Sequence, residues 1–263
     1  MRCGAWHAWC RGVALAAAGC LAACAAGPEP DPRRSGFDFM SPSTQAMQRD
    51  DAQNPGMLWV QDGASLWERR VGRSALSCAD CHGSVASSMR GVASRYPAFD
   101  VATQQPLDLG QRINQCRERR QQAVALGPES QELLGLESFV ASQSRGLPLA
   151  PPADPRLAVW VQRGAQLFGQ RLGQLDLSCA QCHAQRAGQR LGSSTIPQGH
   201  ATGYPIYRLE WQGMGSLQRR IRNCMTGVRA EAFAYGAPEM VALQLYLAER
   251  ARGLPVETPA VRP

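Results

Sequence analysis

The chain has 263 residues, 44% of them hydrophobic, which is enough to form the cores of two domains of about 100 residues each. The net charge is +7, and all 28 basic residues are arginine. Beyond the first 26 residues no segment is apolar enough to cross a membrane, which argues against a spanning helix in the rest of the chain.

The first 26 residues have the pattern of a secretory signal peptide. Two arginines precede a short apolar run, 12–23, and small residues follow it. Residues 23–25, Ala-Cys-Ala, fit ordinary signal cleavage, whereas residues 21–24, Leu-Ala-Ala-Cys, resemble a lipobox that would leave Cys24 lipidated. We therefore expect export through residues 1–26 to the periplasm, either as a free protein or with a lipid anchor at Cys24.

Residues 27–56 are rich in proline and polar side chains and show little periodicity. This composition predicts an extended N-terminal arm that lies on one of the domains. A disordered tether is the alternative.

The rest of the chain contains an internal duplication. Residues 59–67 match 160–168, and 77–82 match 178–183, at an offset of 101. The offset then becomes 108, because the second copy carries about seven extra residues in the stretch 184–203. At the new offset, Tyr96-Pro97 matches Tyr204-Pro205, and the segment from Arg112 to Cys116 matches the one from Arg220 to Cys224.

The repeat predicts two tandem domains, 57–148 and 156–258, joined by the proline-rich linker 149–155. Each domain opens with a helix that carries a glycine and an aromatic residue on one face, continues with Cys-x-x-Cys-His and closes with another helix. This is the plan of a class I cytochrome c. We expect an all-α fold, and no segment predicts a strand.

Both Cys-x-x-Cys-His motifs predict covalent attachment of c-type haem, because the thiols can add to the haem vinyl groups and the imidazole can bind the iron. A zinc or redox site is disfavoured, since each motif ends in histidine within a repeated helical frame. The haem propionates offset the basic charge, so the charge does not indicate nucleic-acid binding. The expected attachment residues are Cys78, Cys81, Cys179 and Cys182, with His82 and His183 as iron ligands.

The second iron ligand is expected to be cysteine in both domains. Cys116 and Cys224 occupy equivalent positions, whereas none of the methionines has a partner at the matching offset. Two buried structural thiols, or a disulfide between them, are the alternatives. A thiolate ligand favours a low reduction potential and is also a latent nucleophile.

An arginine precedes each of these cysteines by four residues, Arg112 in the first copy and Arg220 in the second. On a helix this spacing puts guanidinium and sulfur on the same face. A small dianion with a terminal sulfur would fit such a pair, with arginine binding its oxygens. The alternative is that these arginines bind haem propionates or lie in solvent.

The chain resembles the dihaem SoxA subunit family of the SoxAX cytochromes of bacterial sulfur oxidation. The resemblance rests on the arm segments 35–48 and 54–60 and on the stretch 220–230, Arg-x-x-x-Cys-x-x-x-x-Arg-Ala. Members of this family pair with the monohaem cytochrome SoxX and couple thiosulfate oxidatively to a cysteine of the SoxYZ carrier, and the electrons pass to a cytochrome c acceptor. The resemblance implies that Cys224 is catalytic and forms a persulfide, and that Arg220 binds substrate.

Three other functions are alternatives for a chain with these motifs. A thiosulfate dehydrogenase would join two thiosulfates into tetrathionate without a carrier. A plain dihaem electron carrier usually has methionine ligands, and this chain has no matched distal methionines. A dihaem peroxidase needs an open iron site, which two distal cysteines disfavour. The sequence does not choose between the two domains, because arginine and cysteine recur in both; only the resemblance selects Cys224.

Overall fold

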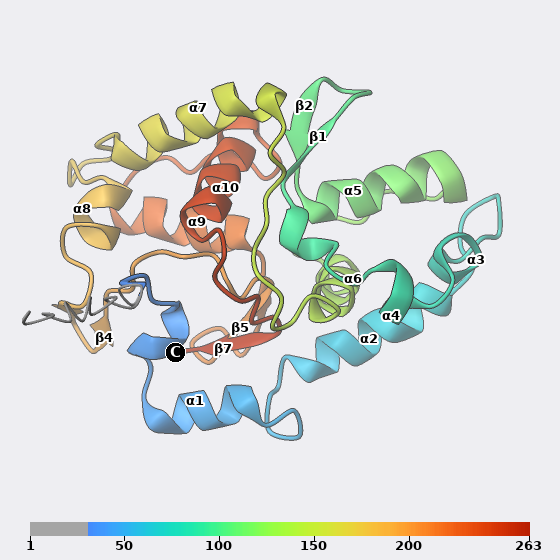
Figure 1. Ribbon diagram of the computed structural model, residues 1–263, viewed down its shortest axis with the longest axis horizontal. Coiled ribbons are helices and arrows are strands. Elements are labelled where there is room, and N and C mark those ends of the chain that lie inside the picture. Colours follow the sequence, from blue (N-terminus) through green and yellow to red (C-terminus); the bar gives the residue numbers. More distant parts are fainter. Residues whose placement is uncertain (1–30) are drawn as a thin grey trace, which may run out of the picture. The chain divides into compact units, whose positions relative to one another are not determined.

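The computed structural model describes residues 31–263, so the predicted signal peptide and Cys24 lie outside the described residues. All elements given below belong to one compact unit, Arg33–Pro263. They are mostly helices, as predicted, and the two copies of the repeat form two neighbouring groups in Figure 1. Within this part of the chain no helix is long and apolar enough to cross a membrane.

The N-terminal arm contains two short helices, η1 (Gly36–Phe39) and α1 (Pro42–Arg49). Ser35 and Ser41 stand immediately before them, and each serine side chain accepts a backbone N–H of the first turn. Neither helix was expected from the sequence, because one or two turns carry too little hydrophobic periodicity to be recognised.

In the first copy, α2 (Met57–Glu68) packs across α6 (Gln131–Ser142). A Cβ at Gly63 would lie 2.1 Å from the carbonyl oxygen of Gly135, so only glycine allows this approach. Trp67, Val140 and Met89 form the core beside this crossing. Between the two helices lie α3 (Cys78–His82), α4 (Val85–Ser88), η2 (Ala93–Arg95), β1 (Ala98–Asp100), β2 (Gln105–Leu107), α5 (Leu109–Cys116) and a π-helical turn, η3 (Arg117–Gln121).

The second copy repeats this plan with η4 (Pro155–Leu157), α7 (Ala158–Gly169) and α10 (Pro238–Arg250). Its core contains Leu167 and Phe168 of α7 and Leu243 and Leu247 of α10. Between α7 and α10 lie α8 (Cys179–His183), β3 (Arg190–Leu191), β4 (Ser194–Thr195), β5 (Ile206–Arg208), β6 (Gly213–Gly215) and α9 (Leu217–Gly227).

The expectation that no strand is present is wrong, since short strands occur in both copies. β1 pairs with β2 and β5 with β6, both antiparallel, and β3 and β4 form a hairpin within the extra stretch 184–203. A last strand, β7 (Ala260–Arg262), runs parallel to β5. Strands of two or three residues show no alternation of polar and apolar positions, so the sequence does not reveal them.

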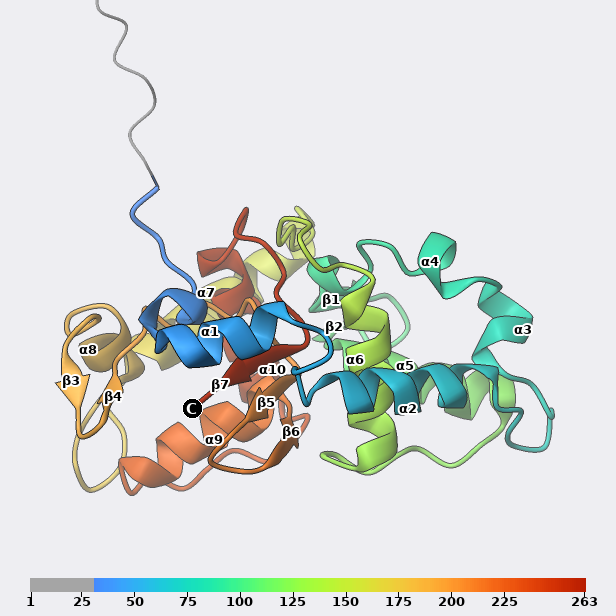
Figure 2. The same ribbon diagram turned by 90° about the horizontal axis from the view of Figure 1, so that it is seen from below.

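The arm lies on the C-terminal segment of the second copy, and Figure 2 shows α1 beside β7. The Gln48 side chain accepts the backbone N–H of Val261 at 3.0 Å and also bonds the Arg262 guanidinium. Asn54 donates to the carbonyl oxygen of Pro259 at 2.9 Å. These contacts join the two ends of the described chain.

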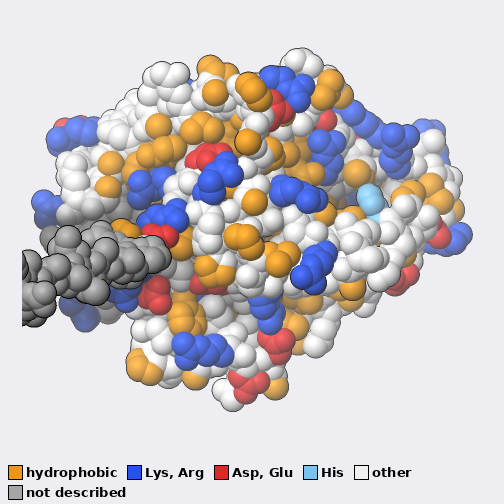
Figure 3. All heavy atoms as spheres, in the orientation of Figure 1, with side chains coloured by type: hydrophobic (Ala, Val, Ile, Leu, Met, Phe, Trp, Pro, Cys, Tyr) orange, Lys and Arg blue, Asp and Glu red, His pale blue; other side chains and the backbone are white. Residues whose placement is uncertain are grey.

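The surface shown in Figure 3 carries arginines dispersed over the face, with acidic side chains between some of them. They are not gathered there into a single basic patch.

Candidate functional site

Both Cys-x-x-Cys-His motifs form single-turn helices, α3 and α8, with the same bounds as the motifs. Ser77 and Ser178 cap them, and in each the side chain of the third helical residue accepts the backbone N–H of the capping serine. The helical turn places the first and fourth residues, both cysteines, on one face. All six cysteines in the described residues are free thiols, so the disulfide considered between Cys116 and Cys224 is not formed in this structure.

The extra stretch of the second copy fixes the orientation of His183. Its Nδ1 donates to the carbonyl oxygen of Pro197 at 2.8 Å, just beyond the β3–β4 hairpin. Because Nδ1 is thereby protonated, Nε2 is the nitrogen available to a metal. In the first copy, the His82 ring lies 5.7 Å from the Trp67 ring.

The structure brings each distal cysteine to the haem-attachment cysteine of its own copy. Cys116 is close enough to Cys78, and Cys224 to Cys179, that each distal cysteine raises the pKa of its neighbour. Cys224, on α9, also forms a hydrogen bond with the His183 side chain. The residues predicted to surround the second haem therefore converge.

The charge around Cys224 is positive. Burial raises the pKa of this thiol, but the hydrogen bond from His183 and the charges of Arg220 and Arg208 outweigh burial, so the pKa lies below its ordinary value. Tyr204 is a neighbour of the same groups, and burial raises the pKa of its phenol. Arg208 was not expected at this site from the sequence.

The equivalent arginine in the first copy is neutralised. The guanidinium of Arg112 pairs with the carboxylate of Asp100 at 3.2 Å and also bonds Gln115. Asp100 accepts further hydrogen bonds from Gln115 and from the hydroxyl and N–H of Thr103. Although burial opposes ionisation, these bonds and Arg112 keep the pKa of Asp100 below its ordinary value.

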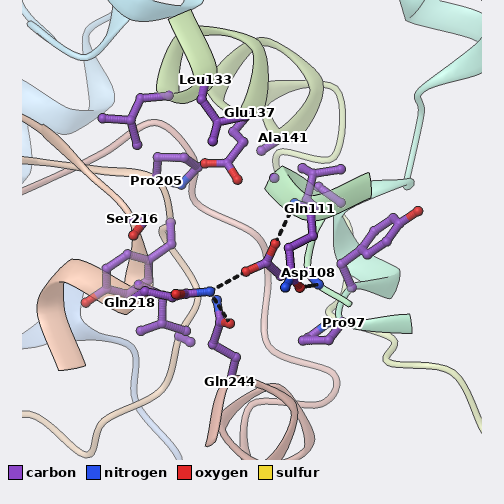
Figure 4. Close-up of a pocket in the computed structure, with 18 of the residues that line it drawn as sticks. Pro97, Asp108, Gln111, Leu133, Glu137, Ala141, Pro205, Ser216, Gln218 and Gln244 are labelled. Carbon is purple, nitrogen blue, oxygen red and sulfur yellow. Dashed lines mark hydrogen bonds between the residues drawn. The ribbon is translucent and has the colours of Figure 1, made fainter. Parts of the chain in front are cut away.

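A cavity of about 340 Å³ lies between the two copies, and no cysteine of the described residues lines it. Figure 4 shows the carboxyl groups of Asp108 and Glu137 in it. Gln218 donates to Asp108 at 2.5 Å. Burial, followed by the charges of Asp108 and Glu129, raises the pKa of Glu137 well above its ordinary value.

The donor sets fit c-type haem. Two thiols one helical turn apart, an imidazole at the end of the same turn and a cysteine from a separate helix are what covalent attachment and axial ligation require. The His183–Pro197 bond supplies the outer support that a ligating histidine usually has. Duplicated helical domains with these motifs define a tandem c-type cytochrome.

Comparison with known proteins gives the family. The SoxA/TsdA cytochrome c domain matches residues 62–149 and 163–256, so the chain belongs to the SoxA/TsdA cytochrome c family. The family is one of c-type cytochromes, which agrees with the predicted haem chemistry and with two tandem domains.

The similarity of this chain to individual relatives extends over most of their length. The L-cysteine S-thiosulfotransferase subunit SoxA of Rhodovulum sulfidophilum is 37% identical over 233 residues, covering 88% of this chain and 81% of the relative. The protein of the same name from Pseudaminobacter salicylatoxidans is 36% identical over 242 residues, covering 90% and 85%. The crystal structure of SoxXA from P. pantotrophus superposes with a TM-score of 0.84 at 34% identity, covering 88% of this chain and 87% of that chain.

Proposed function

We propose that this chain is the SoxA subunit of an L-cysteine S-thiosulfotransferase and couples thiosulfate oxidatively to a cysteine of a SoxYZ-type carrier. The arrangement at Cys224 carries the proposal. Cys224 and His183 face each other, as a pair of ligands to one iron must, and Cys224 lies in the positive field of Arg220 and Arg208. The names of the SoxA relatives support the same activity.

The residues available for haem are the same in both copies. Cys78 and Cys81 would hold the first group and Cys179 and Cys182 the second. The iron would be bound by His82 with Cys116 in the first copy and by His183 with Cys224 in the second. When bound, haem supplies an acceptor for the electrons that the reaction releases.

The side chains around Cys224 perform the binding and orientation. Arg220 is placed to bind the thiosulfate oxygens, because guanidinium forms charge-assisted hydrogen bonds to oxyanions. The terminal sulfur of thiosulfate then bonds to Sγ of Cys224 with loss of two electrons. Attack of the carrier thiolate on that sulfur transfers the thiosulfate group to the carrier and returns the Cys224 thiolate. In the balanced reaction, one thiosulfate and one carrier thiol give one carrier S-thiosulfonate, one proton and two electrons. The proton comes from the carrier thiol, and the electrons leave for a cytochrome c acceptor.

The proposed partners follow from the same family membership. The chain forms a heterodimer with a monohaem SoxX cytochrome, as supported by its likeness to the SoxA chain of SoxXA from P. pantotrophus. It acts in the periplasm after export through residues 1–26, where Cys24 offers a site for a lipid anchor. Nucleic acid is not among the proposed partners.

Mass spectrometry of the carrier tests the activity. The oxidised protein is mixed with its SoxX partner, the carrier and thiosulfate. A thiosulfate-sized adduct on the carrier cysteine is expected. An unmodified carrier with tetrathionate in solution would instead identify a thiosulfate dehydrogenase, and the absence of both products would indicate a simple electron carrier.

A further inference from the structure

The two copies contain the same strand–helix module on the distal side of their haem sites. In the first copy β1 pairs with β2 and leads into α5; in the second β5 pairs with β6 and leads into α9. The paired residues correspond at an offset of 108, so that the pair Asp100–Gln105 matches the pair Arg208–Gly213. Arg112 and Arg220 correspond at the same offset.

Position 100 in the first copy therefore corresponds to position 208 in the second, and the charge is inverted between them. Asp100 is buried and binds Arg112, so the arginine that precedes Cys116 is paired within the protein. A dianion at this place would have to compete with the Asp100 carboxylate for Arg112.

In the second copy this competitor is absent, and a second cation stands in its place. Within residues 31–263 the Arg220 guanidinium makes no hydrogen bond or ion pair. The Arg208 side chain is only 13% exposed, and its Nη2 pairs with Glu210 at 2.5 Å. Its Nε is buried without a hydrogen-bond partner in the described residues. Both arginines act electrostatically on Cys224 and Tyr204.

We propose that Arg208 is a second substrate-binding residue, which together with Arg220 forms a two-arginine clamp for the thiosulfate dianion. Asp100, at the equivalent place, makes the first copy unreceptive to such an anion. This inference rests on the proposed function and explains why the copy with Cys224 is the active one. An unpaired buried Nε–H is costly unless a ligand accepts a hydrogen bond from it, and an oxyanion is a suitable acceptor.

Two other roles for Arg208 would give different results. Arg208 packs against Trp211, with its guanidinium 5.2 Å from the ring centre, and its sole role could be to hold the turn that contains Trp211 in place. It could also bind a haem carboxylate. If Arg208 only held the turn, loss of its charge would lower the unfolding free energy and leave thiosulfate binding unchanged. If it bound a haem carboxylate, the loss would shift the haem reduction potential without a selective effect on thiosulfate binding.

The test measures equilibrium thiosulfate binding to the oxidised holoprotein with its SoxX partner, together with KM and kcat for carrier modification. We expect Arg208→Gln to raise the dissociation constant and KM roughly 10- to 100-fold, with a smaller change in kcat. The haem spectrum and reduction potential should stay as in the wild type. Glu210→Gln, which releases Arg208 from its ion pair, should lower both constants.

Arg252→Gln is the matched control, because Arg252 also pairs with a glutamate, Glu249, but is 43% exposed and is not among the residues found to act on Cys224. It should leave both constants unchanged. Unaltered binding in Arg208→Gln, or a shifted potential with unaltered KM, would overturn the inference. If the wild type binds thiosulfate but leaves the carrier unmodified, the proposed function fails, while the binding measurements still decide the role of Arg208.

Discussion

Gly164 of α7 lies against the backbone of Ala242 of α10 so closely that a Cβ at position 164 would stand 2.1 Å from the Ala242 carbonyl oxygen. Gly63 makes the same approach to Gly135 in the first copy, also at 2.1 Å. Each domain is therefore closed by a glycine at the crossing of its first and last helices. The two helices that frame each haem site depend on this contact for their separation.

Replacing Gly164 by alanine should force the helices apart, because the obstructing atom is backbone and cannot rotate away. We expect a loss of unfolding free energy of about 3 kcal/mol or more, with reduced haem incorporation. Denaturant unfolding and the haem-to-protein absorbance ratio measure these effects. Gly169→Ala is the control, since nothing lies within 4 Å of a Cβ there. Equal stability of the two variants would show that the crossing tolerates a side chain.

Replacing Asp100 by alanine should destabilise the first domain, because Arg112 and Gln115 lose their shared partner. We expect a loss of about 2–4 kcal/mol, somewhat less than the roughly 3–5 kcal/mol for a fully buried ion pair, because the Arg112 side chain is 31% exposed. Since the pKa of Asp100 is lowered in the folded protein, its contribution is present above the unfolded pKa and is lost as the pH falls through the folded pKa.

Urea titrations of the wild type and Asp100→Ala at neutral and acidic pH check this behaviour. Asp51→Ala provides the comparison, because Asp51 is 53% exposed in its pair with Arg145. That variant should differ from the wild type by less than about 0.5 kcal/mol. A difference between Asp100→Ala and the wild type that grows on acidification would contradict the assignment.

The sequence predicts most of the helical frame because its signals are local and duplicated. The glycine and aromatic residues of α2 and α7, and Val241, Leu245 and Ala248 of α10, repeat at helical spacing and are buried where expected. Haem attachment is similarly apparent from a motif of five consecutive residues.

The remaining features depend on contacts that leave no local pattern. The support of His183 by Pro197 uses a backbone carbonyl, which any residue could supply. The pairing of β5 with β7 joins segments about fifty residues apart, so no short window contains it. The exchange of Asp100 for Arg208 could have been found by aligning the two copies residue by residue, because both positions follow the repeated Tyr-Pro by the same distance.

Glu137, in the cavity between the two copies, should make the protein less stable as the pH rises, whereas Asp100 contributes less stability as the pH falls. The raised pKa of Glu137 means that the unfolded chain releases this proton first as the pH increases, which favours unfolding. The wild type should therefore lose stability as the pH rises from the unfolded pKa of Glu137 towards the folded one, and Glu137→Gln should not show this loss.

The measurement compares the unfolding free energies of the wild type and Glu137→Gln from about pH 4 to about pH 8. This is roughly the range in which carboxyl and imidazole groups titrate. The advantage of Glu137→Gln over the wild type should increase with pH. Glu132→Gln, exposed on the same helix, should follow the wild type at every pH. Parallel curves for Glu137→Gln and the wild type would mean that Glu137 is already ionised in the folded state.

The two distal cysteines should differ in function although they occupy equivalent positions. Cys224→Ala removes the sulfur beside His183, Arg220 and Arg208, so carrier modification should fall roughly a thousandfold or more. Cys116→Ala should leave most of the activity, because the arginine that precedes Cys116, Arg112, is paired with Asp100. Rates are compared with haem content matched by absorbance, since either change can alter haem incorporation. Equal losses in the two variants would mean that both copies take part in turnover, and the asymmetry between Asp100 and Arg208 would then not determine which copy is active.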